Sequence, residues 1–230
     1  GTGTTGSRMA NGTYSSHEEL ERELGEFLGY SSAIIFTTGY QANLGTISGL
    51  AGKGDLLIID ADSHASIYDG SKLARGNVVG YKHRDMADLE RVLKAVPEES
   101  GKLIIVDGVF SMEGDIIDLP EVARLAEKYQ ARLVVDDAHG VGILGDSGVG
   151  TSHHFGLQDK VDLIVGTFSK TFASIGGFVV GEHKVIDFIK HYGRSLVFSA
   201  SLPPASVAAA RAALKIMKRE PERVARVNAN

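Results

Sequence analysis

The sequence has no cysteine, no long apolar run and no block of basic residues, and each absence excludes a class of protein. Without cysteine the chain forms no disulfides and has no thiolate chemistry, which fits a cytoplasmic protein. No apolar run is long enough to predict a membrane-spanning helix, and no signal peptide is visible. The net charge of −5 and the scattered Lys and Arg residues disfavour nucleic acid or an anionic membrane as a partner.

Short apolar runs alternate with helical patterns along most of the chain. With 230 residues and 43% hydrophobic content, the chain can bury the core of one large domain. The alternation predicts an α/β fold with a mostly parallel sheet covered by helices on both faces. The predicted strands are residues 33–37, 56–60, 78–82, 103–107, 133–137, 163–167, 178–181 and 196–199. The predicted helices are residues 17–28, a segment from about 39, 64–73, 86–95, 119–129, 185–192 and 203–218.

The first chemical signal is a lysine just past a predicted strand. Residues 161–165 predict a buried strand, and the sequence Gly-Thr-Phe-Ser-Lys that follows ends at Lys170. Lys170 lies between hydroxyl residues and a flexible, glycine-containing stretch. This setting suits an amine that forms a Schiff base with a phosphorylated cofactor. Local sequence alone also fits a solvated surface lysine.

A second signal is the pair Asp136 and His139 at the end of a Val-rich strand. A carboxylate buried there needs a cation or several hydrogen-bond donors. A protonated pyridine nitrogen would supply the cation and keep the ring electron-deficient, while His139 could donate to its phenolic oxygen. A metal bound by Asp136, Asp137 and His139 is the competing interpretation. It ranks lower because no further acidic or histidine set has metal-ligand spacing.

Other candidate residues also follow predicted strands, where an α/β sheet binds its ligands. Thr38, Gly39 and Tyr40 either hold a phosphate at a helix N-terminus or form an ordinary turn. His64 either lies against a cofactor ring or caps its helix. Ser111 either faces the ligand or belongs to a plain loop.

Two further patterns predict no function. The glycines at positions 1, 3 and 6 match the dinucleotide-binding fingerprint, but no strand precedes them, which argues against NAD. The remaining histidines in polar stretches are interpreted as solvated surface residues. They are His83, His153, His154, His183 and His191.

Eight stretches together carry a resemblance to a known family. They are residues 3–8, 11–13, 38–43, 64–67, 108–112, 136–139, 166–170 and 199–204. In this order, and over nearly the whole chain, they resemble the pyridoxal-phosphate-dependent α-oxoamine synthases, which have the type I, aspartate-aminotransferase-like fold. Within the family, residues 11–14, 166–170 and 176–180 look most like the serine palmitoyltransferase branch. The 8-amino-7-oxononanoate synthases and glycine C-acetyltransferases are close relatives.

The resemblance implies a role for each candidate residue toward pyridoxal 5'-phosphate. Lys170 would form the Schiff base, Asp136 would pair with the pyridinium nitrogen, and His64 would stack on the ring. His139 and Ser111 would contact the phenolic oxygen. The backbone of Gly39 and Tyr40, after Thr38, would hold the phosphate together with the hydroxyls of Thr167 and Ser169. The family works as a homodimer, and Ser199 would reach the phosphate bound in the neighbouring subunit.

The implied activity is a decarboxylative condensation of an amino acid with an acyl thioester, carried by CoA or a carrier protein. The leading interpretation is serine with a long-chain acyl-CoA, as in sphingolipid biosynthesis. Three alternatives stay open: another type I reaction such as an aminotransferase or aldolase, a non-catalytic companion subunit, and a simple phosphate-binding module. The presence of Lys170, Asp136 and His139 argues against the second, and the last would not require Lys170.

The resemblance also predicts how the chain is divided. Residues 1–202 would be the cofactor-binding large domain, and 203–230 a helix leading toward a C-terminal domain. Family members carry a segment before the Gly/Thr-rich loop and a domain after the long helix, and that domain holds the arginine for the substrate carboxylate. We therefore expect the chain to be cut on both sides and, alone, to bind the cofactor poorly or turn over slowly.

Overall fold

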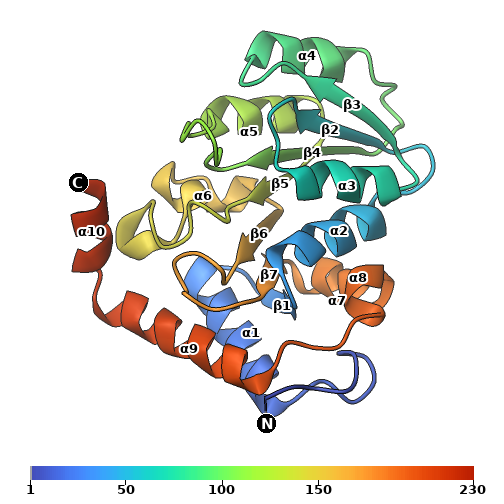
Figure 1. The fold of residues 1–230 in the computed structure, drawn as a ribbon. Coiled ribbons are helices and arrows are strands. Elements are labelled where there is room, and N and C mark those ends of the chain that lie inside the picture. Colours follow the sequence, from blue (N-terminus) through green and yellow to red (C-terminus); the bar gives the residue numbers. More distant parts are fainter. Residues whose placement is uncertain (1) are drawn as a thin grey trace.

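A computed structural model describes residues 2–230 of the chain (Figure 1); Gly1, the first glycine of the fingerprint pattern, lies outside the described residues. A seven-stranded sheet runs through the middle, with the strand order β1-β7-β6-β5-β4-β2-β3. The strands are β1 (Ser32–Phe36), β2 (Leu56–Asp60), β3 (Asn77–Tyr81), β4 (Lys102–Asp107), β5 (Arg132–Asp136), β6 (Leu163–Thr167) and β7 (Gly177–Gly181).

The sheet is mostly parallel, which confirms the predicted fold class. Strands β3, β2, β4, β5 and β6 pair in parallel, and β7 pairs antiparallel with both β6 and β1. Strand β1 therefore runs in the same direction as the parallel strands. The carboxyl ends of six strands consequently meet at one edge of the sheet, and this edge is where α/β proteins bind ligands.

Helices cover both faces of the sheet. One face packs on α1, α4, α5 and α9, and the other packs on α2, α3, α7 and α8 (Figure 1). Each face has its own hydrophobic core, and the side chains of successive strand residues pack into the two cores alternately. In β1, for example, Ile35 packs into the first core and Phe36 into the second. The helices are α1 (Ser15–Leu28), α2 (Gly39–Leu50), α3 (Ala65–Leu73), α4 (Met86–Lys94), α5 (Leu119–Lys128), α6 (Thr151–His154), α7 (His183–Tyr192), α8 (Arg194–Val197), α9 (Pro204–Arg219) and α10 (Glu222–Asn228).

Local sequence determines where several of these helices begin. The side chains of Thr38, Asp85 and Asp118 accept a hydrogen bond from the backbone N–H three residues later and so cap α2, α4 and α5. In α1 the buried residues Leu20, Leu24 and Leu28 recur every four positions and form the stripe that faces the sheet. This apolar spacing is the signal on which the helix predicted for residues 17–28 depended.

One predicted element is wrong. Residues 196–199 were expected to form a strand, but Arg194–Val197 forms the short helix α8. Leu196 is buried against the α2 side of the sheet, and the hydroxyl of Ser195 donates to the Gln41 carbonyl at 2.6 Å. Phe198 is 72% exposed, so no alternation typical of a strand exists. A run of only four residues, even with three apolar members, does not distinguish a strand from one helical turn.

The edge strand β1 is closed by a buried ion pair. Arg8 contacts Glu21 through both guanidinium nitrogens, at 2.6 and 3.1 Å. On the open edge of β1, the Ile35 N–H donates to Glu21 Oε1 at 2.9 Å, and Arg8 Nη1 donates to the Ile35 carbonyl at 3.3 Å. The pair thus replaces the missing neighbouring strand and ties the N-terminal loop to the sheet.

Replacing Arg8 with alanine is expected to lower the free energy of unfolding by about 3–5 kcal/mol, because it leaves the Glu21 carboxylate buried without its cation. Urea unfolding curves measure the effect. The exposed pair Arg22–Glu26 provides the control, since Arg22→Ala should change the midpoint little. Equal midpoints for the two variants would contradict the role assigned to Arg8.

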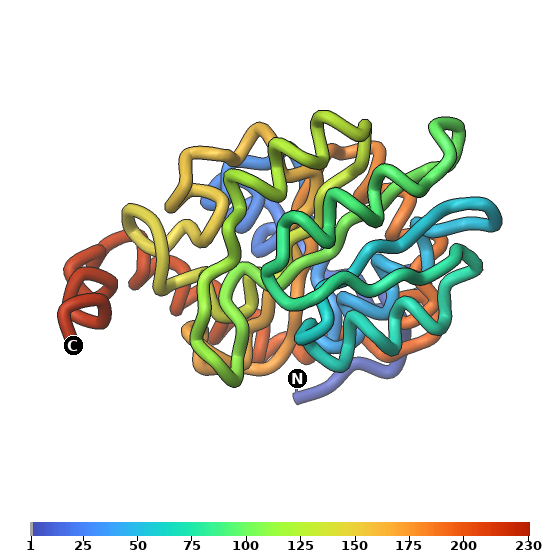
Figure 2. The backbone as a smooth tube through the Cα atoms, turned by 90° about the horizontal axis from the view of Figure 1, so that it is seen from above, coloured from blue at the N-terminus to red at the C-terminus, as the bar shows by residue number. Residues whose placement is uncertain are grey.

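The last helix of the chain and the turns that precede three of the strands lie at opposite ends of the molecule. Figure 2 shows α10 at one end and the turns that precede β2, β3 and β4 at the other. Among residues 2–230, no helix is both long and apolar enough to cross a membrane.

Candidate active site

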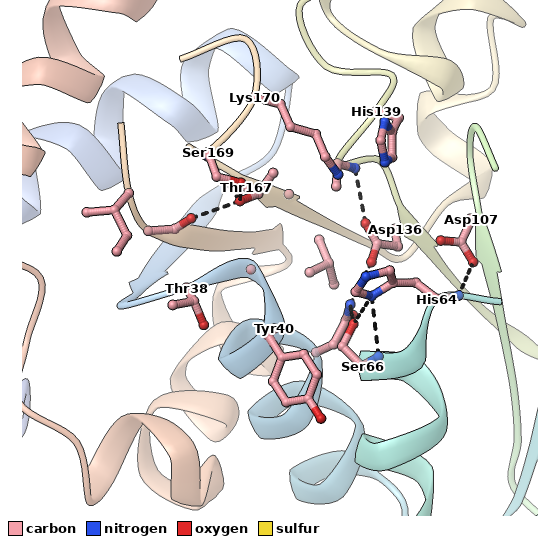
Figure 3. A pocket seen from close by; sticks show the side chains of 17 residues that line it. Thr38, Tyr40, His64, Ser66, Asp107, Asp136, His139, Thr167, Ser169 and Lys170 are labelled. Carbon is pink, nitrogen blue, oxygen red and sulfur yellow. Dashed lines mark hydrogen bonds between the residues drawn. The ribbon is translucent and has the colours of Figure 1, made fainter. Parts of the chain in front are cut away.

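A cavity of about 430 Å³ opens at the carboxyl edge of the sheet (Figure 3). Its walls come from the segments after β1, β2, β4, β5 and β6 and from the loop before β7. Nine of the predicted site residues line it: Thr38, Gly39, Tyr40, His64, Asp136, His139, Thr167, Ser169 and Lys170. Residues far apart in the sequence are therefore gathered around one space. Their roles toward a cofactor remain predictions.

One end of the cavity is rich in hydrogen-bond donors. The N-terminus of α2 opens there at Gly39 and Tyr40, where the first backbone N–H groups of a helix have no intrahelical acceptor. The Thr167 and Ser169 hydroxyls lie 2.8 Å apart on the facing wall. Two hydroxyls and a helix N-terminus form a site suited to a phosphate group.

Glycine is required at this end of the cavity because two backbone segments nearly touch. A Cβ on Gly39 would lie 2.9 Å from Thr167 Cβ, and one on Gly177 would lie 2.6 Å from Gly39 Cα. Both distances are too short for any larger residue without movement of the backbone. The close contact holds the start of α2 against the end of β6 and so fixes the donor-rich end.

Asp136 is a buried carboxylate with no ion-pair partner among residues 2–230. Its side chain accepts hydrogen bonds from Asn43 Nδ2 at 2.6 Å and from the Ala138 N–H at 3.0 Å. The residue is only 6% exposed, and within residues 2–230 it forms no ion pair. A buried carboxylate directed into a cavity without a cationic partner fits a ligand that carries a protonated ring nitrogen.

Lys170 and His139 face Asp136 across the cavity (Figure 3). Burial lowers the pKa of Lys170, although the carboxylates of Asp136 and Asp107 oppose the shift. Burial, followed by the charge of Lys170, also lowers the pKa of His139. Both shifts favour the neutral forms, an amine that can act as nucleophile or base and an imidazole that can donate one hydrogen bond.

His64 is held by a hydrogen-bond chain that leads back to Asp136. The Ser66 hydroxyl and backbone N–H both approach His64 Nδ1, at 2.7 and 3.3 Å, so Nδ1 is the acceptor. Asn43 Nδ2 bonds both Ser66 Oγ, at 2.8 Å, and Asp136. The predicted cap is confirmed, because the His64 side chain caps α3. Its ring also lines the cavity, and its contact with a cofactor ring stays a prediction.

Two residues of the site were missed as functional candidates. Asn43 is 1% exposed and links the two walls, and its Oδ1 has no partner in the described part of the chain. The feature that could have identified Asn43 is its polar side chain on the buried face of a helix, beside Ala42, Thr46 and Ile47. Asp107 ends β4 next to Asp136 and lines the cavity. Its signal was an acidic residue ending a buried strand.

The metal interpretation has little geometric support. Both Asp137 oxygens accept from Thr151, Oδ2 from the backbone N–H at 2.7 Å and Oδ1 from the hydroxyl at 2.5 Å. Burial raises the pKa of Asp137 to about 6. The side chain thus holds the loop behind His139 and does not line the cavity. Across residues 2–230, no group of three or more His, Cys, Asp or Glu could hold a metal ion.

Ser111 and Ser199 lie outside the cavity lining. Ser111 is exposed in the turn after β4, so its predicted contact with the phenolic oxygen has no support in this geometry. Ser199 lies beside Gln41, whose Nε2 donates to its hydroxyl at 3.4 Å, which leaves its predicted role in a neighbouring subunit untested.

His83 was wrongly interpreted as a solvated histidine. Its Nδ1 lies 2.8 Å from the buried Asp60, and its ring packs edge-on against Phe110. His153 is also only partly exposed, whereas His154, His183 and His191 are exposed or nearly so. The polar sequence around His83 therefore predicted a solvent-exposed side chain, but this side chain folds back onto the end of β2.

The family assignment follows from comparison with known proteins. The profile of the family described as aminotransferase class I and II matches residues 2–230, and the chain belongs to this family. The serine palmitoyltransferase of Sphingobacterium spiritivorum is 55% identical over 222 residues, which are 96% of this chain and 56% of that protein. The 8-amino-7-oxononanoate synthase of Thermoanaerobacter pseudethanolicus is 49% identical over 218 residues, which are 94% of this chain and 55% of that protein.

A solved structure agrees in fold. SPT with a PLP internal aldimine, where SPT is serine palmitoyltransferase, superposes with a TM-score of 0.96 at 44% identity. The match covers 100% of this chain and 57% of that one. The resemblance to the α-oxoamine synthases and the type I fold are confirmed. The chain spans just over half the length of the curated relatives it matches.

Proposed function

We propose that this chain binds pyridoxal 5'-phosphate covalently through Lys170. The observation that carries the proposal is that one cavity brings together the amine of Lys170, the cation-free carboxylate of Asp136 and the donor-rich end at Gly39. These three features match the aldehyde, the ring nitrogen and the phosphate of this cofactor, in that order. The solved relative with bound PLP supports the same ligand.

Different residues of the cavity hold the ligand and move a proton. When bound, the cofactor supplies an aldehyde that joins an amine and a ring that withdraws electrons from the attached amino acid. Asp136 would hold the protonated ring nitrogen, His64 would lie against the ring, and His139 would donate to the phenolic oxygen. Lys170, with its lowered pKa, is the base that takes the proton from the substrate Cα.

We further propose that the full-length protein condenses serine with a long-chain acyl-CoA and releases CO2, as a serine C-palmitoyltransferase. Two relatives named serine palmitoyltransferase, at 55% and 51% identity, support this branch. An 8-amino-7-oxononanoate synthase activity is the second candidate, because relatives of that name are almost as similar. The proposal includes a homodimer in which Ser199, which lies outside the cavity lining of its own subunit, reaches the phosphate of the neighbouring subunit.

In this proposal residues 1–202 form the cofactor domain, and residues 203–230 lead toward a further domain. The sheet and the cavity lie entirely within the first range. Helix α9 packs on α1 and continues into α10, which lies at one end of the molecule (Figure 2).

An absorbance titration of the full-length protein tests the proposed function. Pyridoxal phosphate is added first, followed by serine, glycine and alanine in separate samples. We expect a visible band that serine alone shifts. A band shifted by alanine or glycine but not by serine would overturn the serine assignment and favour the other branches of the family. No protein-dependent band at all would overturn the cofactor proposal.

A further inference from the structure

Three neighbouring parallel strands each end in a buried aspartate. Asp60, Asp107 and Asp136 are the last residues of β2, β4 and β5, which lie side by side in the sheet. Their exposed fractions are 0%, 6% and 6%. Asp107 and Asp136 are also direct partners in the strand register. Asp107 and Asp136 therefore lie side by side at the cavity edge, whereas Asp60, at the end of the next strand, does not line the cavity. Buried negative charges this close together are expensive.

The two outer carboxyl groups have more donors than the middle one. Asp60 accepts from the N–H groups of Asp62 and Arg84, each at 2.9 Å, and lies 2.8 Å from His83 Nδ1. Asp136 has its bonds from Asn43 and Ala138, and it faces the proposed ring nitrogen. The middle group, Asp107, accepts one backbone N–H, that of His64, at 3.2 Å (Figure 3).

Charge and burial act on Asp107 in the same direction. Burial, and after it the charge of Asp136, raises the pKa of Asp107 to about 8, and Asp60 adds to the effect. Lys170 is the cation on the cavity side, and burial lowers its pKa. At neutral pH the middle carboxyl group therefore carries a proton, while its oxygen still accepts the His64 N–H.

We propose that Asp107 is a positioning residue that acts, as a neutral carboxylic acid, through His64. It anchors the backbone N–H of His64 at the start of α3, so that the imidazole lies over the cavity, and Ser66 fixes the ring from the other end. Because Asp107 is uncharged, Asp136 alone balances the charge of the ring nitrogen. The inference rests on the proposed function, since the ligand under the ring is pyridoxal phosphate.

Binding of pyridoxal phosphate to variants of the full-length protein tests the positioning role. Asp107→Asn keeps a carbonyl oxygen for the His64 N–H and should bind within about threefold of wild type. Asp107→Leu removes the acceptor from a buried donor and should weaken binding roughly tenfold. In a His64→Ala background, Asp107→Leu should add nothing, because Asp107 acts through that ring. Equal binding by wild type and Asp107→Leu, or fully additive effects, would overturn the proposal.

The proton on Asp107 is tested without cofactor, by the pH dependence of unfolding. Unfolded Asp107 ionises near its ordinary pKa of 3.8, whereas the folded group keeps its proton to about 8. The wild type therefore loses stability relative to Asp107→Asn as pH rises from about 4 to about 8. Asp159→Asn, which removes an exposed carboxyl group, is the control. A constant difference between Asp107→Asn and wild type would overturn the proposal.

The two proposals fail in different ways. If the wild type binds no pyridoxal phosphate, the proposed function falls, and the unfolding experiment still reports the proton on Asp107. If the wild type binds and Asp107→Leu binds equally well, the proposed function stands and the positioning role of Asp107 falls.

Discussion

Lys170→Ala is expected to reduce condensation activity of the full-length protein on the order of 10⁴-fold or more while leaving it folded. The substitution removes both the amine that joins the cofactor and the base that takes the substrate proton, and the latter alone typically contributes about 10²–10⁴-fold. Lys170 is exposed at the cavity and forms no ion pair within residues 2–230, so the fold does not depend on its charge. Turnover of serine and acyl-CoA measures the effect.

The exposed Lys184 at the start of α7 gives the matched control, since Lys184→Ala removes an amine remote from the cavity and should leave turnover unchanged. Unchanged activity of Lys170→Ala in the assembled enzyme would contradict the account. It would instead favour the companion-subunit interpretation, in which another chain performs the chemistry.

Asp136→Asn is expected to lower turnover on the order of 10²–10³-fold, which is typical when a group that stabilises developing charge is removed. The amide has nearly the same shape as the carboxylate, so the cavity should keep its form. It carries no charge, so the ring nitrogen loses its proton and the ring withdraws electrons less strongly. Lys170 remains, and the visible band of bound cofactor should persist with an altered position.

Turnover and spectrum together separate an electronic effect from a loss of binding. A second carboxylate variant, Asp159→Asn in an exposed turn, should match wild type in both measurements. Wild-type turnover by Asp136→Asn would show that the ring nitrogen needs no anionic partner in this protein.

The alternation of strands and helices was predictable because the core on both sides of the sheet is built from short apolar runs. The predicted strands 163–167 and 56–60 have the same bounds as β6 and β2 in the structure. Helix α1 was predictable because its apolar residues recur at helical spacing, as Leu20 and Leu24 do. The order of the strands was not predictable, because β7 inserts between β1 and β6 through contacts distant in sequence.

The candidate site was predictable where a residue stands at a strand end within a recognisable motif, as Lys170 and Asp136 do. Asn43 and His83 could not be found in this way. Each acts through a partner far along the chain, Asp136 for Asn43 and Asp60 for His83. Their roles depend on which strand ends become neighbours, and that information lies in the sheet order.

Reduction of the pyridoxal-phosphate-loaded full-length protein with borohydride, followed by peptide mapping, tests the central claim most directly. The account predicts one stable cofactor adduct, on Lys170, and none when serine has displaced that amine before reduction. An adduct on any other lysine, or no adduct on a protein that shows the visible band, would contradict it.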